Sequence, residues 1–326
     1  MSEVAVVLMA YGSPDRIEDV PAYYADIRGG RPIAPELLDD LVARYRALGI
    51  EDSNPLNEIT ERTRAALEAE LGIPVFTGMR HWQPRIAEAT EQALAAGART
   101  IVGLVLAPHY SSLSIEKYRG LLVEAVADRA ELRFVERWGD EPGFVELLAA
   151  RIRSALRGSE PRSPQHVVFT AHSLPARIVA EGDPNRDELL ETARLVAEAA
   201  GVEEWSFSFQ SESPTGEPWL GPDILDHLTA LHGQGVRDVL VCPVGFVADH
   251  LEIRQDIDTE AVERAAELGL ALARIEMPND DPAMVAVLAG IARRTAALPA
   301  GSSLVSVASV ARRCSATSAA YAASAR

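Results

Sequence analysis

One stretch of the sequence indicates the fold class most clearly. It is Val239-Leu240-Val241-Cys242-Pro243-Val244-Gly245-Phe246-Val247-Ala248-Asp249-His250-Leu251-Glu252-Ile253-Arg254-Gln255-Asp256-Ile257-Asp258-Thr259-Glu260. The apolar run at its start predicts a buried strand, and Pro243 and Gly245 then predict a turn. Helical spacing begins at Asp249. A strand that leads through a short turn into a helix is the repeating unit of α/β proteins.

The helix after this turn concentrates acidic side chains on one face. At 100° per residue, Glu252, Asp256 and Glu260 stack above one another, with Asp249 one turn earlier. Like charges at i,i+4 destabilise a helix by about 0.2–0.5 kcal/mol per pair. Two interpretations fit: a path for a cation or for protons, or the solvated face of a very acidic protein. Because His250 and Glu252 are expected on different faces of the helix, no typical zinc site is predicted.

The overall charge argues against several classes of partner. The chain has 326 residues with 31 basic and 48 acidic side chains, which gives a formal net charge of −17. This balance argues against nucleic acid, and any anionic substrate needs local arginines that act against the global field. No stretch approaches the ~20 apolar residues of a membrane span, and no signal-peptide pattern is present. We therefore expect a cytoplasmic protein without a membrane span.

Apolar runs and helical patterns alternate along the whole chain. The predicted strands are Val4–Met9, Pro74–Met79, Thr100–Leu106, Leu132–Val135, His166–Ala171, Trp205–Phe209, Val239–Cys242 and Leu270–Ile275, and helical stretches lie between them. Two successive sets of four strands predict two α/β domains with parallel sheets, at residues 1–157 and 166–298. A Gly/Pro/Ser-rich linker joins them, and residues 299–326 form an Ala/Ser-rich tail that we expect to be mobile.

Polar residues follow several of these strands. Tyr11 follows the first strand of the first half, and His172 follows the first strand of the second half. In a two-domain protein these strand ends can face a shared cleft, so Tyr11, His172 and Glu252 are expected to converge. His172 stands in a Ser-Leu-Pro turn, where imidazole serves as a metal ligand or a proton acceptor. His109, His227 and His232 are interpreted as structural.

Familiar nucleotide-binding and hydrolase motifs are absent from the sequence. No strand is followed by G-x-G-x-x-G, by a P-loop or by a G-x-S-x-G elbow, so phosphate cradles and a hydrolase nucleophile are not predicted. The two cysteines, Cys242 and Cys314, are too few for a disulfide framework, a zinc ribbon or a four-cysteine iron–sulfur site.

Five motifs together resemble those of the ferrochelatases. They are Tyr11-Gly12-Ser13-Pro14; Ala107-Pro108-His109-Tyr110-Ser111-Ser112-Leu113-Ser114 with Tyr118; Thr170-Ala171-His172-Ser173-Leu174-Pro175; Phe209-Gln210-Ser211 with Pro218-Trp219-Leu220-Gly221-Pro222-Asp223; and the residues from Pro243 to Glu252. The match covers nearly the whole chain up to the tail and stays in register. It implies a chelatase-like fold of two Rossmann-like domains, each with a four-stranded parallel sheet flanked by helices, around an active-site cleft.

The resemblance also implies a reaction and the residues that perform it. Ferrochelatases insert Fe²⁺, their metal substrate, into a porphyrin, and two pyrrole protons are released. His172 matches the essential histidine of the family, which takes protons or passes the metal, and Glu252 matches its acidic partner. Asp256 and Glu260 match an acidic route that leads metal or protons along a π-type helix.

Tyr11 is the position that discriminates between porphyrins. A tyrosine here resembles the monofunctional coproporphyrin III ferrochelatases of Gram-positive and actinobacterial type, in which the phenol oxygen lies opposite the histidine and ligates the iron. Relatives that use protoporphyrin generally have an apolar residue at this position. The resemblance therefore implies coproporphyrin III as substrate, coproheme as product, a role in haem biosynthesis and a monomeric enzyme.

The four propionates of coproporphyrin need hydrogen-bond donors. Arg28, Arg44, Ser53 and Tyr118 match, or lie near, positions that contact propionates in relatives. Two features depart from the family: Gly29 stands where some relatives have a second arginine, and the loop at residues 49–55 is longer. Some relatives hold a [2Fe–2S] cluster through four cysteines, and this chain is expected to lack it.

Three alternatives remain open from the sequence. A protoporphyrin IX ferrochelatase is the nearest, and a cobalt or nickel chelatase is more distant. From another class, a non-catalytic protein that binds haem or metal could share the same fold. His81 is assigned equally to the surface or to the cleft rim, whereas Trp219 and Phe246 are interpreted as packing residues.

Overall fold

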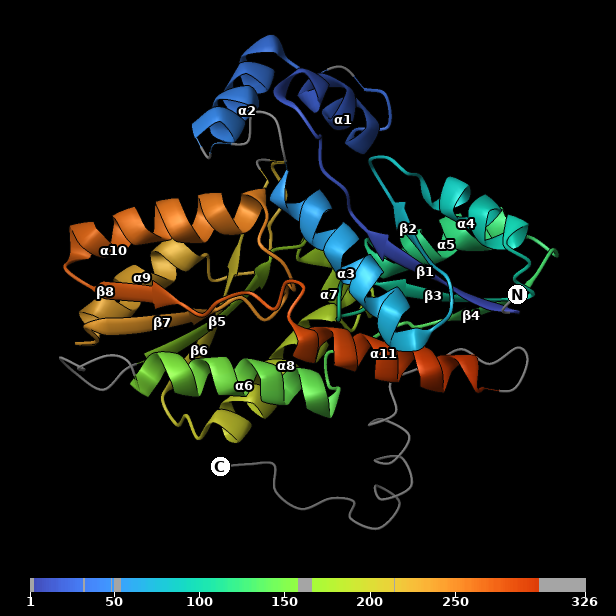
Figure 1. Cartoon of the computed structure of the whole chain (residues 1–326). Coiled ribbons are helices and arrows are strands. Elements are labelled where there is room, and N and C mark those ends of the chain that lie inside the picture. Colours follow the sequence, from blue (N-terminus) through green and yellow to red (C-terminus); the bar gives the residue numbers. More distant parts are fainter. Residues whose placement is uncertain are drawn as a thin grey trace.

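The computed structural model describes residues 3–31, 33–47, 49, 54–157, 166–213 and 215–298. Ser53, Cys314, the predicted linker and the predicted mobile tail lie outside the described residues. Within the described ranges, strands and helices alternate along the chain, and both halves carry a parallel sheet covered by helices (Figure 1). The eight strands are β1 (Val4–Ala10), β2 (Val75–Met79), β3 (Thr100–Val105), β4 (Glu131–Phe134), β5 (His166–His172), β6 (Trp205–Gln210), β7 (Asp238–Cys242) and β8 (Ala271–Arg274).

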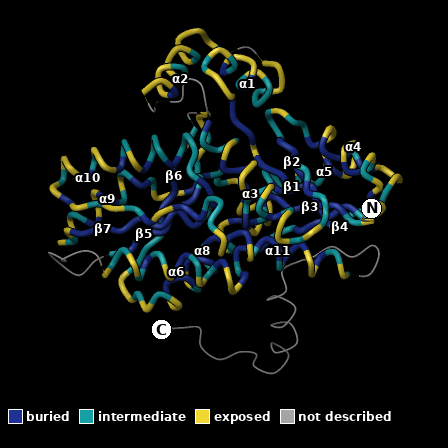
Figure 2. Tube along the Cα trace, in the orientation of Figure 1, coloured by how far each residue is buried: buried dark blue, intermediate teal, exposed yellow. Residues whose placement is uncertain are grey.

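The two sheets have the same strand order. The first is β2-β1-β3-β4 and the second is β6-β5-β7-β8, and every pairing is parallel. Val6 pairs with Val75 on one side and with Val102 on the other, and Val168 pairs in the same way with Ser206 and Val241. The central strands are buried on both faces because helices cover the sheets (Figure 2). The predicted fold class is confirmed.

The helices include one segment of π winding. They are η1 (Ile17–Asp19), α1 (Val20–Ile27), α2 (Pro35–Ala47), α3 (Pro55–Leu71), α4 (Ile86–Ala95), α5 (Ile115–Val126), α6 (Pro142–Arg157), α7 (Arg177–Ala180), α8 (Asn185–Ala200), α9 (Ile224–Gly233), the π-helix η2 (Ile253–Ala261), α10 (Val262–Leu268) and α11 (Pro282–Ala296). Short α7 has no counterpart in the sequence prediction. The helical spacing from Asp15 to Arg28 predicts a single helix, but the structure splits this stretch into η1 and α1, and Pro21 occupies the second position of α1.

The last helix of each half packs across the molecule. α6 lies against α8 and the second sheet, whereas α11 lies against α3 and the first sheet (Figure 1). One hydrophobic cluster therefore runs through both halves, from Val6 in β1 to Phe169 in β5 and Leu288 in α11. This shared core holds the carboxyl ends of β1 and β5 in a fixed relation. A domain boundary between residues 157 and 166 remains a prediction.

α1 and α2 project above the rest of the molecule (Figure 1). α2 is exposed along most of its length and buries Tyr45 alone (Figure 2). Tyr45 and Val20 form a small apolar cluster, and Leu251 from the second half packs against it. Helices α1 and α2 therefore pack against Leu251, the residue that directly precedes Glu252.

Candidate active site

The loop that carries Tyr11 is pinned by the first turn of α3. Asn54 Nδ2 donates to Ser13 Oγ at 2.7 Å, and Asn57 Nδ2 donates to the Ser13 carbonyl at 2.7 Å. Gly12 has a φ of +83°, and a Cβ there would lie 2.7 Å from Cβ of Trp82, so only glycine fits. The turn after β1 is therefore rigid, and it presents Tyr11 with 39% of its surface exposed.

Arg80 and His81 surround the Tyr11 ring. The His81 ring centroid lies 4.6 Å from that of Tyr11, and His81 Nδ1 is 2.8 Å from an oxygen of Asp26 in α1. The Arg80 guanidinium lies 5.9 Å from the Tyr11 ring and 5.6 Å from the Tyr118 ring. Burial and then the charge of Glu252 raise the pKa of the Tyr11 phenol to about 12, although Arg80 opposes them. The phenol is therefore protonated at neutral pH.

His172 ends β5 with one ring nitrogen fixed. Its Nδ1 forms a hydrogen bond with the Ser173 carbonyl, which can only accept, so Nδ1 carries the proton. In the neutral ring, Nε2 then presents its lone pair, and it lies 3.8 Å from Oε1 of Glu252. The Trp219 ring centroid is 6.5 Å from that of His172. A lone pair beside a carboxylate oxygen is suited to accept a proton or a cation.

Glu252 stands between two imidazoles. His250 Nε2 lies 3.6 Å from Oε2 of Glu252, on the opposite carboxylate oxygen from His172, and His250 Nδ1 donates to the Ala248 carbonyl at 2.9 Å. Burial tends to raise the pKa of Glu252, but His172 and His250 outweigh it and lower the pKa to about 2. Burial tends to lower the pKa of His250, and Glu252 reverses this and raises it. The carboxylate is thus held in its charged form.

The expectation that His250 and Glu252 point in different directions is wrong. Helical spacing does not apply to His250, because the helix starts after it and its backbone is in the preceding loop. Phe246, whose ring centroid lies 4.8 Å from that of His250, packs against the imidazole. The sequence feature that could have predicted the contact between His250 and Glu252 is that both residues lie in the same motif, two positions apart.

Asp256 and Glu260 lie on the π-helix η2, where the i to i+5 spacing of that winding is visible. Thr259 Oγ1 donates to the Arg254 carbonyl, and Gln255 Nε2 donates to Glu260 Oε1, both at 2.9 Å and both across five residues.

The pKa of Asp256 is shifted toward neutrality. Asp256 accepts hydrogen bonds from Ser211 Oγ and, at 3.4 Å, from Gln210 Nε2. Burial raises the pKa of Asp256 to about 6, against Ser211 and with help from Glu252 and Glu260. A carboxyl group with this pKa exchanges protons near neutral pH.

The residues expected to bind propionates are scattered. Arg28, at the end of α1, is half-buried with its Nε lacking a hydrogen-bond partner among the described residues, and Arg44 is exposed on α2. Tyr118 is 3% exposed and lies in the core beneath Arg80. Ser53 lies outside the described residues. Arg80, which the sequence analysis missed although it precedes His81 directly, is the cation that stands beside Tyr11.

The described residues contain no group of three histidine, cysteine, aspartate or glutamate side chains placed to hold a metal ion. A cation at His172 and Glu252 would therefore keep open coordination positions, as a metal that must be handed on requires. Two pockets of about 410 and 480 Å³ flank Arg274, and neither is lined by His172, Glu252 or Tyr11. Among the same residues, no helix is long and apolar enough to cross a bilayer.

Comparison with known proteins identifies the family. The family model described as Ferrochelatase matches residues 3–296. The chain belongs to the ferrochelatase family. It is a metal chelatase of haem biosynthesis that acts on a porphyrin, with iron as its metal substrate. The carboxylate and the imidazoles around Glu252 thus stand in a protein whose family reaction moves a cation in and protons out.

Individual relatives match almost end to end. A ferrochelatase of Herpetosiphon aurantiacus is 44% identical over 298 residues, which cover 88% of this chain and 97% of the relative. A coproporphyrin III ferrochelatase of Halalkalibacterium halodurans is 38% identical over 302 residues, covering 90% and 97%. The solved structure of SirB from Bacillus subtilis with Fe³⁺ has a TM-score of 0.59 at 13% identity, covering 91% and 96%, and shows the shared fold.

The cysteines give no further information on an iron–sulfur cluster. Cys242 is fully buried in β7, where burial raises the pKa of its thiol. Cys314 lies outside the described residues. The expectation that no cluster is bound stays a prediction.

Proposed function

We propose that this ferrochelatase inserts Fe²⁺ into coproporphyrin III and releases coproheme and two protons. The observation that carries the proposal is Tyr11, a phenol held on a rigid turn in the field of Glu252. Several relatives that are 36–38% identical are named coproporphyrin III ferrochelatases, which supports the same substrate. We also expect the enzyme to be monomeric and cytoplasmic.

His172 acts as the base in this reaction. Its Nε2 lone pair accepts a pyrrole proton, and the adjacent charge of Glu252 stabilises the imidazolium that forms. The same nitrogen and carboxylate form the inner contact for Fe²⁺ before it enters the macrocycle. Tyr11 supplies a phenol oxygen as ligand on the opposite face of the porphyrin.

Asp256 and Glu260 provide the outer acidic route. With a pKa near 6, Asp256 can receive a proton from the inner site and release it to solvent. Arg28, Arg44, Ser53 and Tyr118 are proposed to bind the propionates, and Arg80 joins them because its guanidinium stands beside Tyr11. The three arginines, Arg28, Arg44 and Arg80, offset the net charge of −17 for a tetra-anionic substrate.

Anaerobic mixing with Fe²⁺ tests the substrate assignment. We expect the absorbance of coproporphyrin III to shift faster than that of protoporphyrin IX. Equal or reversed rates would refute the assignment and favour a protoporphyrin ferrochelatase. A protein that binds coproheme tightly but metalates neither porphyrin would be a haem-binding module.

A substitution tests the role of the histidine. His172→Ala should abolish metalation while coproporphyrin III still binds, as measured by quenching of porphyrin fluorescence. His232→Ala, near the end of α9 and outside the site motifs, is the matched control and should retain turnover. Retained turnover in His172→Ala would remove this residue from the mechanism.

A further inference from the structure

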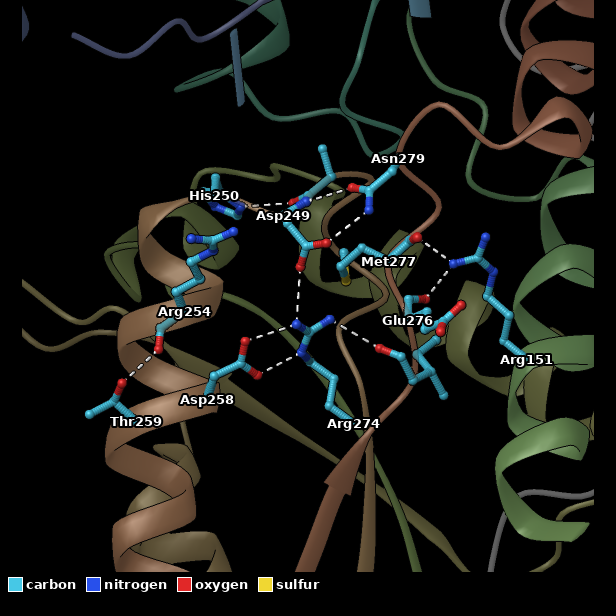
Figure 3. Close-up of polar contacts among 12 residues, drawn as sticks. Arg151, Asp249, His250, Arg254, Asp258, Thr259, Arg274, Glu276, Met277 and Asn279 are labelled. Carbon is cyan, nitrogen blue, oxygen red and sulfur yellow. Dashed lines mark hydrogen bonds and ion pairs between the residues drawn. The ribbon is translucent and has the colours of Figure 1, made fainter. Parts of the chain in front are cut away.

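The segment that carries His250 and Glu252 is gripped from outside by a neighbouring loop. Asp249 is the residue gripped: Arg274 Nη2 lies 3.0 Å from its Oδ1, and Asn279 Nδ2 donates to its Oδ2 at 2.8 Å (Figure 3). The Asp249 backbone N–H in turn donates to Asn279 Oδ1 at 2.8 Å. Every polar group of Asp249 except its carbonyl therefore has a partner in Arg274, the last residue of β8, or in Asn279, in the loop that follows β8.

The same arginine also holds the π-helix. Arg274 Nε lies 2.8 Å from Asp258 Oδ1, and Arg274 Nη2 lies 2.8 Å from Asp258 Oδ2. One guanidinium thus joins Asp249, before the helix, to Asp258 in its middle, and Glu252 lies between these two points in the chain (Figure 3). The Arg274 side chain is only 17% exposed, so these bonds are less screened by water than surface ion pairs.

The loop itself is anchored to helices of the first half. Arg151 of α6 donates to the Glu276 carbonyl at 2.6 Å and pairs with Asp281 at 2.9 Å, and it also binds the Met277 carbonyl. Arg62 of α3 forms a fork with Asp280 at 2.7 and 3.1 Å. The loop that holds Asp249 is therefore itself bound to α3 and α6 of the first half.

We expect the segment from Asp249 to Asp258 to need the bonds from Arg274 and Asn279 to keep its conformation. π winding is rare and its wide i to i+5 ring is poorly packed, so it persists where surrounding contacts impose it. Here the π-helix carries Asp256 and Glu260 and directly follows Glu252, and the like charges of these three side chains repel one another. A relaxation to α winding would change the rise per residue and hence the distance from Asp249 to Asp258, which the Arg274 fork fixes.

We propose that Arg274 is a positioning residue of the chelation reaction, which together with Asn279 holds the segment from Asp249 to Asp258 so that Glu252 stays between His172 and His250. The inference rests on the proposed role of Glu252. Arg274 acts through Asp249. His250 follows Asp249 directly in the chain, and the His250 imidazole faces the Glu252 carboxylate. A displacement of 1 Å at a reacting group lowers the rate by roughly 100-fold.

The test compares Arg274→Gln and Arg274→Lys with the unmodified enzyme. Arg274 lines two surface pockets, so a shorter side chain leaves space for water and the variants should fold. We expect kcat to fall at least about tenfold while the Kd of coproporphyrin III is unchanged. Lysine restores the charge but not the fork, so it should recover thermal stability without recovering kcat.

Hydrogen exchange supplies a readout that does not depend on turnover. Amides of residues 249–258 should exchange faster in both Arg274 variants and in Asn279→Gly, which keeps the φ of +50° at that position while removing the side-chain bonds. Arg64→Gln is the matched control, because Arg64 is 21% exposed and also pairs with two carboxylates, Glu61 and Glu68. It should lose stability without any change in kcat or in that exchange.

Two results would overturn the proposal. One is unchanged kcat with unchanged exchange of residues 249–258 in Arg274→Gln. The other is a loss of kcat that Arg274→Lys restores in step with its melting temperature, which is the behaviour of a purely structural ion pair. Glu252→Gln is measured separately: if it keeps full turnover, the proposed role of Glu252 fails, whereas the exchange data still report whether Arg274 and Asn279 hold the segment.

Discussion

Gly245 gives the most direct test of how the turn after β7 positions the site. A Cβ on this residue would lie 2.5 Å from Ala171 Cβ and 2.9 Å from Ala171 Cα. Carbon atoms in contact are normally about 3.5–4.0 Å apart, so Gly245→Ala forces a separation of about 1 Å. Neither neighbour can rotate away, since both belong to the backbone or are fixed directly on it.

This steric strain displaces the segments that carry His172 and Glu252. Ala171 directly precedes His172, and the Gly245 N–H donates to the Thr170 carbonyl at 3.1 Å. Moving β5 and the turn apart therefore changes the 3.8 Å distance between His172 Nε2 and Glu252 Oε1. Overpacking of this kind lowers the free energy of unfolding by about 1–3 kcal/mol, and a 1 Å displacement lowers the rate by roughly 100-fold.

The assay measures both quantities on the same samples. Anaerobic Fe²⁺ insertion into coproporphyrin III gives kcat, and urea unfolding gives the free energy of unfolding. Gly120→Ala in α5 is the matched control, because a Cβ there meets nothing within 4 Å and should leave both quantities unchanged or slightly raise stability. A Gly245→Ala protein with unchanged kcat and unchanged unfolding would refute the argument.

Three further predictions concern titration and substrate contacts. Burial raises the folded-state pKa of Asp256 from 3.8 to about 6, so ionisation of this carboxyl group destabilises the folded protein as the pH rises from about 4 to 6. In urea unfolding, Asp256→Asn should therefore be more stable than the parent protein above pH 6. Below pH 4 the two proteins should be equally stable. Tyr11→Phe keeps the ring against His81 but removes the oxygen, so coproheme should bind more weakly and its Soret band should shift; an unchanged band would exclude the phenol as a ligand. Arg80→Gln should raise the KM for coproporphyrin III about tenfold by removing a charged donor, and should leave the KM for its tetramethyl ester unchanged; equal changes for the two would rule out a carboxylate contact.

Much of the architecture could be predicted from local patterns. The central strands β1, β5 and β7 are apolar runs buried along almost their whole length, which is a property of the residues themselves, and all eight predicted strands overlap the observed ones. The split at Pro21 and the short helix α7 were missed because they depend on one or two residues rather than on a period. The π winding of η2 is not encoded by spacing, because acidic side chains four apart stack on an α-helix as well.

The sequence by itself determined the order of strands and helices, placed Tyr11 and His172 at strand ends, and placed Glu252 on the helix that follows the turn after Val239–Cys242. Only the tertiary structure decided the chemical state of the site. Glu252 is held ionised by His172, eighty positions earlier, and by His250, which local helical spacing had placed on another face. Electrostatic coupling depends on distance through space, here 3.8 and 3.6 Å, and those distances are set by a turn packed on Ala171 and by the grip of Arg274 on Asp249.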